Sequence, residues 1–271
     1  MSADQPLGAH IDALVRAGTV RRKTTEVQLE AEFRRREEVL TQTFRRYVSP
    51  RVADKILEDP QLRDTLLSTA DVRAHAVVLF ADLRGFTSIS EQLEPHCVVP
   101  LLNEFFSLLT EITFRHEGTV FHMAGDCLML GFGVPLEQAD SPERAVHAAR
   151  EMLISFGGLA RSWKERYQIE AGLGIGISEG DVVAGNIGSS SYMNYTIIGD
   201  TVNIAARLCQ RARAGEMLFS SALKHSLDEH GMDVGATPLP PLQLRGRSHA
   251  IDIFCVPRET RMQLSAGSVS A

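Results

Sequence analysis

The sequence predicts an α+β fold with a mostly antiparallel sheet, and three observations lead to this class. Strand-like apolar runs alternate with helical patterns from residue 74 onward. Short glycine-containing segments between apolar runs indicate hairpins, which pair their strands antiparallel. The element order, β-α-β-β-α-β followed by further elements, is that of a ferredoxin-like split βαβ core. The chain of 271 residues would carry an N-terminal helical extension before this core.

Each expected element has a local reason. Residues 76–83 are almost continuously apolar, as in a strand buried on both faces. Residues 95–118 place apolar side chains at three- and four-residue steps and close at Gly118, which indicates a helix. Ser141 before Pro142 is a typical helix start. In order, we expect a strand (76–83), a helix (95–118), a hairpin turning at residues 124–126 (119–133), a helix (141–167), a hairpin turning at Glu179-Gly180 (169–188), a strand (194–199) and a helix capped by Asp200 or Thr201 (200–212).

The N-terminal region has a helical pattern of its own. Between residues 24 and 47 the chain is rich in Glu, Arg and Gln, and its apolar residues recur with spacings of 4, 7, 4 and 3. This spacing fits a heptad seam. The segment is either a surface helix on its own domain or a short parallel coiled coil between protomers, and both interpretations stay open. The seam residues are Leu29, Phe33, Leu40, Phe44 and Tyr47.

These patterns divide the chain into three parts. Residues 1–70 form a helical segment that dimerises or transmits a signal, and residues 71–257 form the globular domain. Residues 258–271 are small and polar, and we expect them to be disordered.

Composition argues against several classes of protein. A net charge of −6 disfavours general nucleic-acid binding. Four scattered cysteines without a CxxC pair disfavour structural zinc and a disulfide framework. The N-terminus lacks the apolar region of a signal peptide, and Asn103 and Glu104 interrupt the longest apolar stretch, so we expect no membrane insertion. The prediction is a soluble, cytoplasmic protein.

Two aspartates follow strand-like apolar runs, Asp82 in VVLFADLRGFTSIS and Asp126 in GTVFHMAGDCLMLGFG. Taken singly, Asp82 is readily explained as a helix cap and Asp126 as a turn former. Two carboxylates on adjacent strands are, however, costly to bury together without a cation, and they are suitable ligands for hard metal ions. The pair therefore predicts a shared two-metal site of the kind used for in-line chemistry at phosphorus.

The turn after Asp82 is suited to phosphate. Gly85 permits a tight turn into a helix, and the backbone N–H groups of Gly85, Phe86 and Thr87 would point outward from the helix start. The carbonyl of Leu83 could complete the metal site.

A third motif, YTIIGDTVNIAARL, places Asn203 and Arg207 four residues apart on a predicted helix, so that they share a face. An amide beside a guanidinium can orient a sugar and neutralise charge that develops on a phosphoryl oxygen. A solvated polar face is the plain alternative, but the rest of this helix is almost wholly apolar.

Five motifs in order resemble those of class III nucleotidyl cyclase catalytic domains. They are FADLRGFTSIS, GTVFHMAGDCLMLGFG, GIGISEGDVVAGNIGS, YTIIGDTVNIAARL and LQLRGRSHAIDIFCV, spread over roughly residues 74–257. Five motifs in one order are far more specific than any one alone.

The resemblance implies a homodimer that binds nucleotide between its protomers. Asp82, Leu83 and Asp126 of one protomer would hold two Mg²⁺ or Mn²⁺ ions, while Asn203 and Arg207 would come from the other. The reaction would be attack of the ribose 3′-oxygen on the α-phosphorus, which releases pyrophosphate and leaves a 3′,5′-cyclic nucleotide. Arg245 stands at the position of a phosphate-binding lysine.

The resemblance also implies a two-residue code for the base. The first position, usually Lys in adenylate cyclases, is His122, and the second is Thr196, a variant of many bacterial adenylate cyclases. Imidazole and hydroxyl groups can each donate or accept, whereas Lys only donates. Adenine and guanine differ in which of their edge groups donate and accept. ATP is favoured as the substrate, with a guanylate or dual-specificity cyclase as the alternative.

Two competing interpretations fit less well. A diguanylate cyclase carries a GG(D/E)EF-type turn, whereas this hairpin reads MAGDCLM. A non-catalytic dimerisation or nucleotide-binding module would be expected to have lost one of the four central polar residues, and all four are present. Some relatives carry a basic residue in the loop of Asp181, so Asp181 is assigned no role.

Overall fold

The computed structural model describes residues 71–189, 192–243 and 250–257, together with four isolated positions nearer the N-terminus. The chain divides into two units, Met1–Arg46 and Tyr47–Ala271, and every element below belongs to the second. The predicted heptad seam, the polar tail and Arg245 lie outside the described residues. The division after residue 70 stays a prediction.

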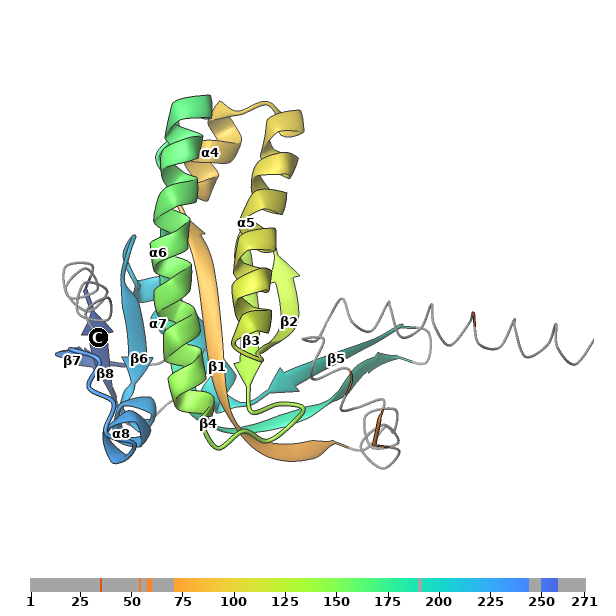
Figure 1. Ribbon diagram of the computed structural model, residues 1–271, viewed down its shortest axis with the longest axis vertical. Coiled ribbons are helices and arrows are strands. Elements are labelled where there is room, and N and C mark those ends of the chain that lie inside the picture. Colours follow the sequence, from red (N-terminus) through yellow and green to blue (C-terminus); the bar gives the residue numbers. More distant parts are fainter. Residues whose placement is uncertain are drawn as a thin grey trace, which may run out of the picture. The chain divides into compact units, whose positions relative to one another are not determined.

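The described elements are strands and helices interspersed along the chain (Figure 1). They are β1 (Val72–Arg84), α4 (Phe86–Gln92), α5 (Pro95–Arg115), β2 (Thr119–Ala124), β3 (Cys127–Phe132), α6 (Ser141–Tyr167), β4 (Gly172–Ser189), β5 (Tyr192–Ile198), α7 (Asp200–Arg211), β6 (Met217–Ser220), α8 (Ser221–Glu229), β7 (Thr237–Leu242) and β8 (Ile251–Val256).

The strands form one mostly antiparallel sheet. Its order in the described part of the chain is β2-β3-β1-β4-β6-β8-β7, and β5 pairs with β4 outside this path. The β4–β6 pair is parallel, and the other pairs are antiparallel. The α+β class and the β-α-β-β-α-β order are therefore confirmed.

β1 is buried on both of its faces because helices cover both sides of the sheet. Val77 and Leu79 belong to a core that also includes buried side chains of α5 and α6, which run side by side (Figure 1). Ala76 and Val78 point the other way, into a second cluster that includes Ala205 of α7. Successive strand residues face opposite sides, so a two-sided burial requires the continuous apolar run seen in the sequence.

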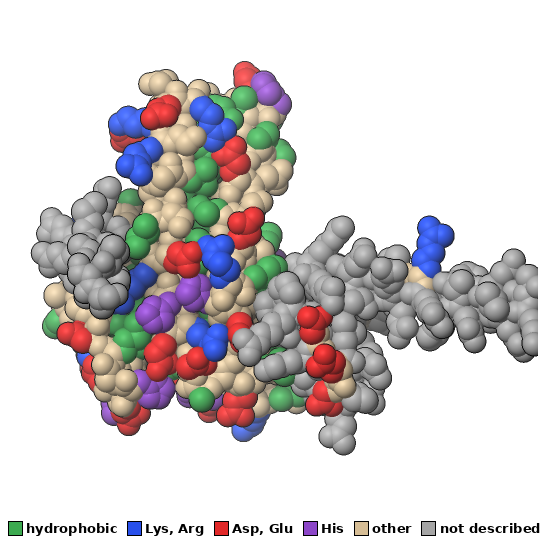
Figure 2. All heavy atoms as spheres, in the orientation of Figure 1, with side chains coloured by type: hydrophobic (Ala, Val, Ile, Leu, Met, Phe, Trp, Pro, Cys, Tyr) green, Lys and Arg blue, Asp and Glu red, His purple; other side chains and the backbone are tan. Residues whose placement is uncertain are grey.

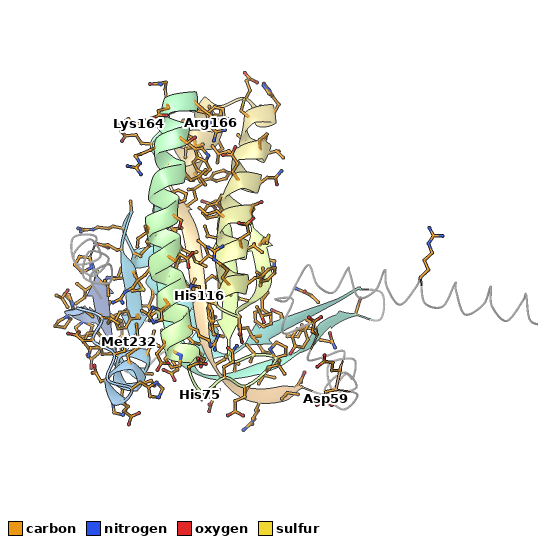
Figure 3. All side chains as sticks on the ribbon, viewed as in Figure 1. Asp59, His75, His116, Lys164, Arg166 and Met232 are labelled. Carbon is orange, nitrogen blue, oxygen red and sulfur yellow. The ribbon has the colours of Figure 1, made fainter. Side chains whose placement is uncertain are left out.

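The solvent side of this layer carries charged side chains together with exposed apolar ones such as Val99 of α5 and Ile154 of α6. On the face that Figure 2 shows, acidic and basic side chains are interspersed over the described residues. Figure 3 shows side chains of α5 and α6 filling the space between the two helices, with Lys164 and Arg166 at the C-terminal end of α6.

The predicted hairpin at Glu179-Gly180 is wrong. β4 runs through both residues as one strand of 18 residues, and both pair with β1, opposite Val77 and Ala76. Gly180 has a φ of +152°, yet no turn forms because the β1 ladder continues on either side of it. Its hydrogen atom leaves room for the hydroxyl of Thr201, which would lie 2.8 Å from a Cβ at this position. The reversal comes later, where β4 and β5 pair as a two-stranded extension of the sheet (Figure 1).

Two smaller expectations also change. α7 begins after Gly199 with no side-chain cap, and the Thr201 hydroxyl donates instead to the Asp181 carbonyl at 2.9 Å. Among the described helices, α5 is long and apolar enough to cross a membrane, with a mean hydropathy of 1.4, despite Asn103 and Glu104. One face of it packs in the core through Leu101, Phe105, Leu109, Ile112 and Thr113, as a core helix of a globular domain does.

Candidate active site

The sheet brings Asp82 and Asp126 together. Asp82 lies near the end of β1, directly opposite Cys127 of β3. Asp126 occupies the tight turn between β2 and β3, where Gly125 has a φ of +59°. The backbone N–H of Leu83 donates to the Asp126 carbonyl at 3.1 Å, which fixes the turn against the strand end. The predicted pairing of the two strand-end aspartates is therefore present in the fold.

Burial, a cation and a second carboxylate all act on Asp82. Burial raises the pKa of Asp82 above its usual value, the Arg84 guanidinium opposes this effect, and the negative charge of Asp126 adds to it. The Asp82 side chain is 25% exposed and pairs with Arg84. A divalent cation bound by both carboxylates would offset the burial and their mutual repulsion.

The donor set fits a hard divalent ion. Within residues 71–189, 192–243 and 250–257 no group of three or more His, Cys, Asp or Glu side chains is placed to hold a metal. A site built from Asp82 and Asp126 would thus complete its coordination with carbonyl, water or phosphate oxygens. This is the usual arrangement for Mg²⁺, which binds through one or two carboxylates plus substrate phosphates. The Leu83 side chain is a buried hydrocarbon without a ligand atom, so only the backbone carbonyl of Leu83 could take part.

The turn after Asp82 has the predicted form. Gly85 precedes α4 with a φ of +88°, in the left-handed region that favours glycine. A Cβ at Gly85 would lie 3.3 Å from the Glu170 carbonyl. α4 has no side-chain cap, so the N–H groups of Phe86 and Thr87 at its start are not used by a capping side chain.

α7 presents Asn203 and Arg207 together on its exposed face. Arg207 donates to Gln210 at 2.9 Å. Within the described chain, neither residue forms a hydrogen bond or ion pair with Asp82 or Asp126. One protomer therefore shows two separate sets of polar residues, the strand-end carboxylates and the α7 pair. The opposite face of the helix is buried through Thr201, Ile204, Ala205, Leu208 and Cys209.

The two predicted base-reading residues lie on neighbouring elements. His122 is exposed on β2, next to a register shift in the β2–β3 pairing. Thr196 is half-buried on β5, opposite Gly185 of β4. The residues just before them, Phe121 and Tyr195, pack ring against ring with centroids 6.0 Å apart. Burial raises the pKa of the Tyr195 hydroxyl to about 12, so it stays protonated.

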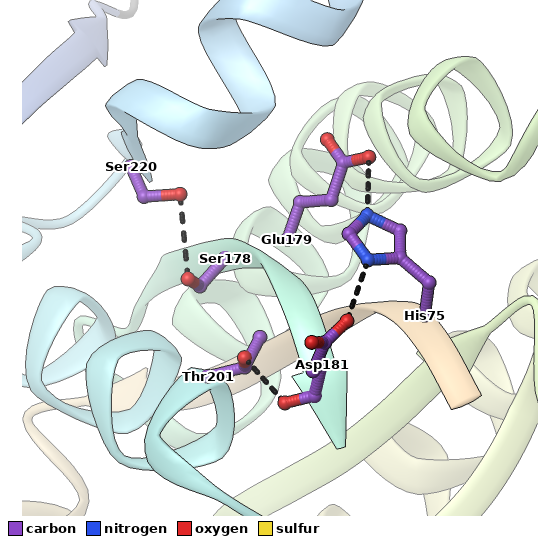
Figure 4. A network of polar contacts seen from close by, with 6 residues as sticks. All are labelled: His75, Ser178, Glu179, Asp181, Thr201 and Ser220. Carbon is purple, nitrogen blue, oxygen red and sulfur yellow. Dashed lines mark hydrogen bonds and ion pairs between the residues drawn. The ribbon is translucent and has the colours of Figure 1, made fainter. Parts of the chain in front are cut away.

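Two further polar residues have partners that the sequence did not predict. Asp181, which the sequence left without a role, contacts His75 through its carboxylate at 3.1 Å (Figure 4). Arg84, which was not predicted, pairs with Asp82 and reaches the C-terminal end of α7. The spacing of Asp82 and Arg84 could have predicted this pair, because residues two apart on a strand lie on the same face.

Comparisons with known proteins identify the domain. The adenylate and guanylate cyclase catalytic domain family matches residues 70–256. The crystal structure of the adenylyl cyclase CyaB from P. aeruginosa is 30% identical with a TM-score of 0.66, covering 69% of this chain and 95% of that one. The guanylyl cyclase Cya2 is 31% identical with a TM-score of 0.62, covering 68% and 92%.

Among curated sequences, adenylate cyclase 1 of Rhizobium meliloti is 29% identical over 222 residues, which is 78% of this chain and 31% of that protein. The chain spans only 26% to 31% of the length of the curated relatives that it matches. The match to the family covers most of the chain and the whole described sheet. The chain therefore belongs to the class III adenylate and guanylate cyclase family.

Proposed function

We propose that this chain is an adenylate cyclase that converts ATP to 3′,5′-cyclic AMP and pyrophosphate. The observation that carries the proposal is the hydrogen-bonded union of the Asp82 strand end with the Asp126 turn. It places two carboxylates of suitable chemistry beside a glycine turn whose N–H groups no side chain caps. Membership of the cyclase family supports nucleotide cyclisation in general. ATP and the residue roles below are our inference.

The proposed reaction is an intramolecular transfer of the α-phosphoryl group from the pyrophosphate to the ribose 3′-oxygen. The ribose 3′-oxygen forms a bond to the α-phosphorus, the bond from that phosphorus to the bridging oxygen of the β-phosphate breaks, and the 3′-hydroxyl proton leaves to solvent. Two Mg²⁺ or Mn²⁺ ions held by Asp82 and Asp126, with the Leu83 carbonyl, would lower the pKa of the 3′-hydroxyl and neutralise the triphosphate.

The protein groups would bind and orient the substrate. Asn203 would position the ribose, and Arg207 would neutralise the charge that grows on the transferring phosphoryl group. Backbone N–H groups from Gly85 to Thr87 would hold phosphate oxygens, and Arg245 would contact a terminal phosphate.

A homodimer would complete the site. Within the described residues, the exposed α7 pair forms no hydrogen bond or ion pair with the strand-end carboxylates, which suits two sites at the interface of a symmetric dimer. We place the protein in the cytoplasm, without membrane insertion or nucleic-acid partners. We also assign the N-terminal helices to dimerisation or to contact with a regulatory partner.

The choice of ATP as the substrate rests on His122 and Thr196, which would contact the base. An N–H of the His122 ring would donate to adenine N1, and the Thr196 hydroxyl would accept from N6. The relatives include adenylyl and guanylyl cyclases alike, so a guanylate or dual-specificity cyclase is the second candidate.

One experiment tests the activity and the base together. The purified protein is incubated with Mn²⁺ and either ATP or GTP, and the product is identified by mass spectrometry. We expect cyclic AMP from ATP at a higher kcat/KM than cyclic GMP from GTP. Asp82→Asn should lose product by at least about 10²-fold because it removes a metal ligand, while its dimer remains intact by light scattering. If the unmodified protein formed neither cyclic AMP nor cyclic GMP, with Mn²⁺ or with Mg²⁺, the proposed cyclisation would be refuted. Formation of cyclic GMP alone would refute the assignment of ATP.

A further inference from the structure

Arg84 is the last residue of β1 and lies two positions after Asp82. Their side chains therefore share one face of the strand. This is the face toward α7, because Ala76 and Val78 on the same side pack in the cluster that contains Ala205. Arg84 is thus placed between a predicted metal ligand and the helix that carries the predicted catalytic residues.

All three guanidinium nitrogens of Arg84 have partners, and these partners lie on β1 and at the end of α7. Nη1 pairs with the Asp82 carboxylate, and Nη2 donates to the Cys209 carbonyl. Nε donates to the carbonyl of Ala212, the C-cap of α7, at 2.9 Å. Carbonyls in the last turn of a helix lack partners within the helix and carry partial negative charge, so a planar cation with several donors suits them.

The sheet leaves a space shaped for this side chain. A Cβ at Gly174 of β4 would lie 2.5 Å from Nε and 2.7 Å from Nη2 of Arg84. Glycine at this position is therefore what allows the guanidinium to cross β4 and reach α7. The Arg84 side chain is 25% exposed, and a charge this buried requires the partners that it has.

We propose that Arg84 is a positioning residue that ties the carboxylate of Asp82 to the C-terminal end of α7. The inference rests on the proposed function. In the dimer, Asp82 serves one active site and the α7 of the same protomer serves the other. Arg84 consequently links the metal-binding half of one site to the Asn203 and Arg207 half of the second.

The first test separates the charge of Arg84 from its geometry. Arg84→Lys keeps the positive charge but has one ammonium that cannot reach three acceptors. We expect Mn²⁺ affinity, measured by electron paramagnetic resonance without nucleotide, to stay within about twofold, while kcat falls at least about tenfold. Arg84→Gln should bind Mn²⁺ as tightly or more tightly, since a cation beside the metal site is removed, with the same loss of kcat. A wild-type kcat in Arg84→Lys would overturn the proposal, as would a weakened Mn²⁺ affinity that accounts for the loss.

Gly174→Ala gives the same test without changing any charge. Its methyl group would displace the guanidinium, so kcat should fall as in Arg84→Lys while Mn²⁺ affinity is kept. Arg144→Lys is the matched control for Arg84→Lys, because Arg144 pairs with Asp140 at the N-cap of α6 and with Glu117 in the α5–β2 loop, away from the contacts of Arg84. The control should leave kcat unchanged. Wild-type kcat in Gly174→Ala would contradict the role of the guanidinium.

Mixed dimers test the link across α7. A protomer with Asp82→Asn paired with a protomer with Asn203→Ala retains one intact site, built from Asp82 of the second and α7 of the first. Arg84→Lys is then placed on either protomer. We expect both placements to lower kcat. If kcat fell only when Arg84→Lys was on the protomer that supplies the intact Asp82, Arg84 would act only on the carboxylate. The proposed link to α7 would then be wrong.

A readout without catalysis keeps this inference distinct from the proposed function. Arg84→Lys should speed hydrogen exchange of the amides in the last turn of α7, because Cys209 and Ala212 lose an anchor. If the unmodified protein made no cyclic nucleotide, the proposed function would fail while faster exchange still supported the link. Unchanged exchange at this turn would refute the link even in an active enzyme.

Discussion

Gly176 of β4 lies directly beneath Cys209 of α7, so closely that a Cβ at Gly176 would be 2.6 Å from the Cys209 Cα and nearer still to its backbone nitrogen. The helix that carries Asn203 and Arg207 therefore packs directly against the backbone of β4 at Gly176. A side chain as small as that of alanine at this position would force the helix further from the sheet.

Gly176→Ala should displace α7. The clash is with backbone, so the helix has to move, at a cost of about 1–3 kcal/mol in stability. We expect kcat to fall by about tenfold or more because displacement of catalytic groups by about 1 Å is costly. The measurements are urea unfolding and cyclic AMP production. Gly158→Ala on α6 is the control, since its Cβ would meet nothing within 4 Å, and it should be neutral or slightly stabilising. Equal stability and equal kcat in Gly176→Ala and Gly158→Ala would contradict the proposed displacement of α7.

His122→Lys should strengthen the preference for ATP over GTP. A lysine ammonium only donates and so suits the acceptor at adenine N1, whereas an imidazole can donate or accept. We expect the ratio of kcat/KM for ATP to kcat/KM for GTP to rise by about fivefold or more, measured from initial rates with each nucleotide. An unchanged ratio would show that His122 does not read the base.

His75 should stabilise the domain at low pH. Its ring lies between Asp181 at 3.1 Å and Glu179 at 3.2 Å (Figure 4). The hydrogen bond to Asp181 is the largest cause of a raised pKa for His75, and Glu179 adds to it against the effect of burial. A raised folded-state pKa means that the contribution is fully present below the ordinary value of 6.5 and is lost as pH rises through the folded value.

The test of His75 is thermal unfolding of the wild type and His75→Gln as a function of pH. The ring is largely exposed, so the difference in Tm should be small, about 2 °C at pH 5.5, and should vanish at alkaline pH. A difference that grew with pH would reverse the sign and exclude this explanation.

Glu104 should hold the middle of α5 against the C-terminal end of α6. Its carboxylate accepts the indole N–H of the buried Trp163 at 2.8 Å and pairs with Arg166, whose hydrogen bond is the largest cause of a lowered pKa for Glu104. Glu104→Ala leaves a buried donor without its acceptor and should cost about 1–3 kcal/mol in urea unfolding. Glu104→Gln keeps an acceptor and should cost less. Because the pKa is lowered, the effect of the charge is present above about pH 4.5 and lost in more acidic solution. Equal losses in both variants would argue against the indole contact.

Much of the fold and part of the site could be predicted from local patterns. The apolar run of β1 specified a strand buried on both faces, and the helical spacing of α7 correctly placed Asn203 and Arg207 on one exposed face. These patterns are readable because side-chain direction follows the period of the backbone. The family motifs then indicated which polar residues belong together.

Other features depend on contacts between distant segments. Glu179-Gly180 resembles a turn locally, but the ladder with β1 keeps β4 extended through it. Arg84 resembles a surface residue after a strand, yet its partners Cys209 and Ala212 lie 125 and 128 residues further on. Such pairings follow from sheet register and from where a helix crosses a strand, which no local propensity encodes.

The sequence by itself therefore determined the class of the fold, the strand-end aspartates and the polar face of α7, because these depend on backbone period and on motif order. Only the tertiary structure decided that the Asp126 turn is hydrogen-bonded to the end of β1 and that Arg84 reaches from Asp82 to α7. The physical reason is that both require β3, β4 and α7 to pack around one end of β1. Close packing there leaves room only for glycine at Gly174 and Gly176.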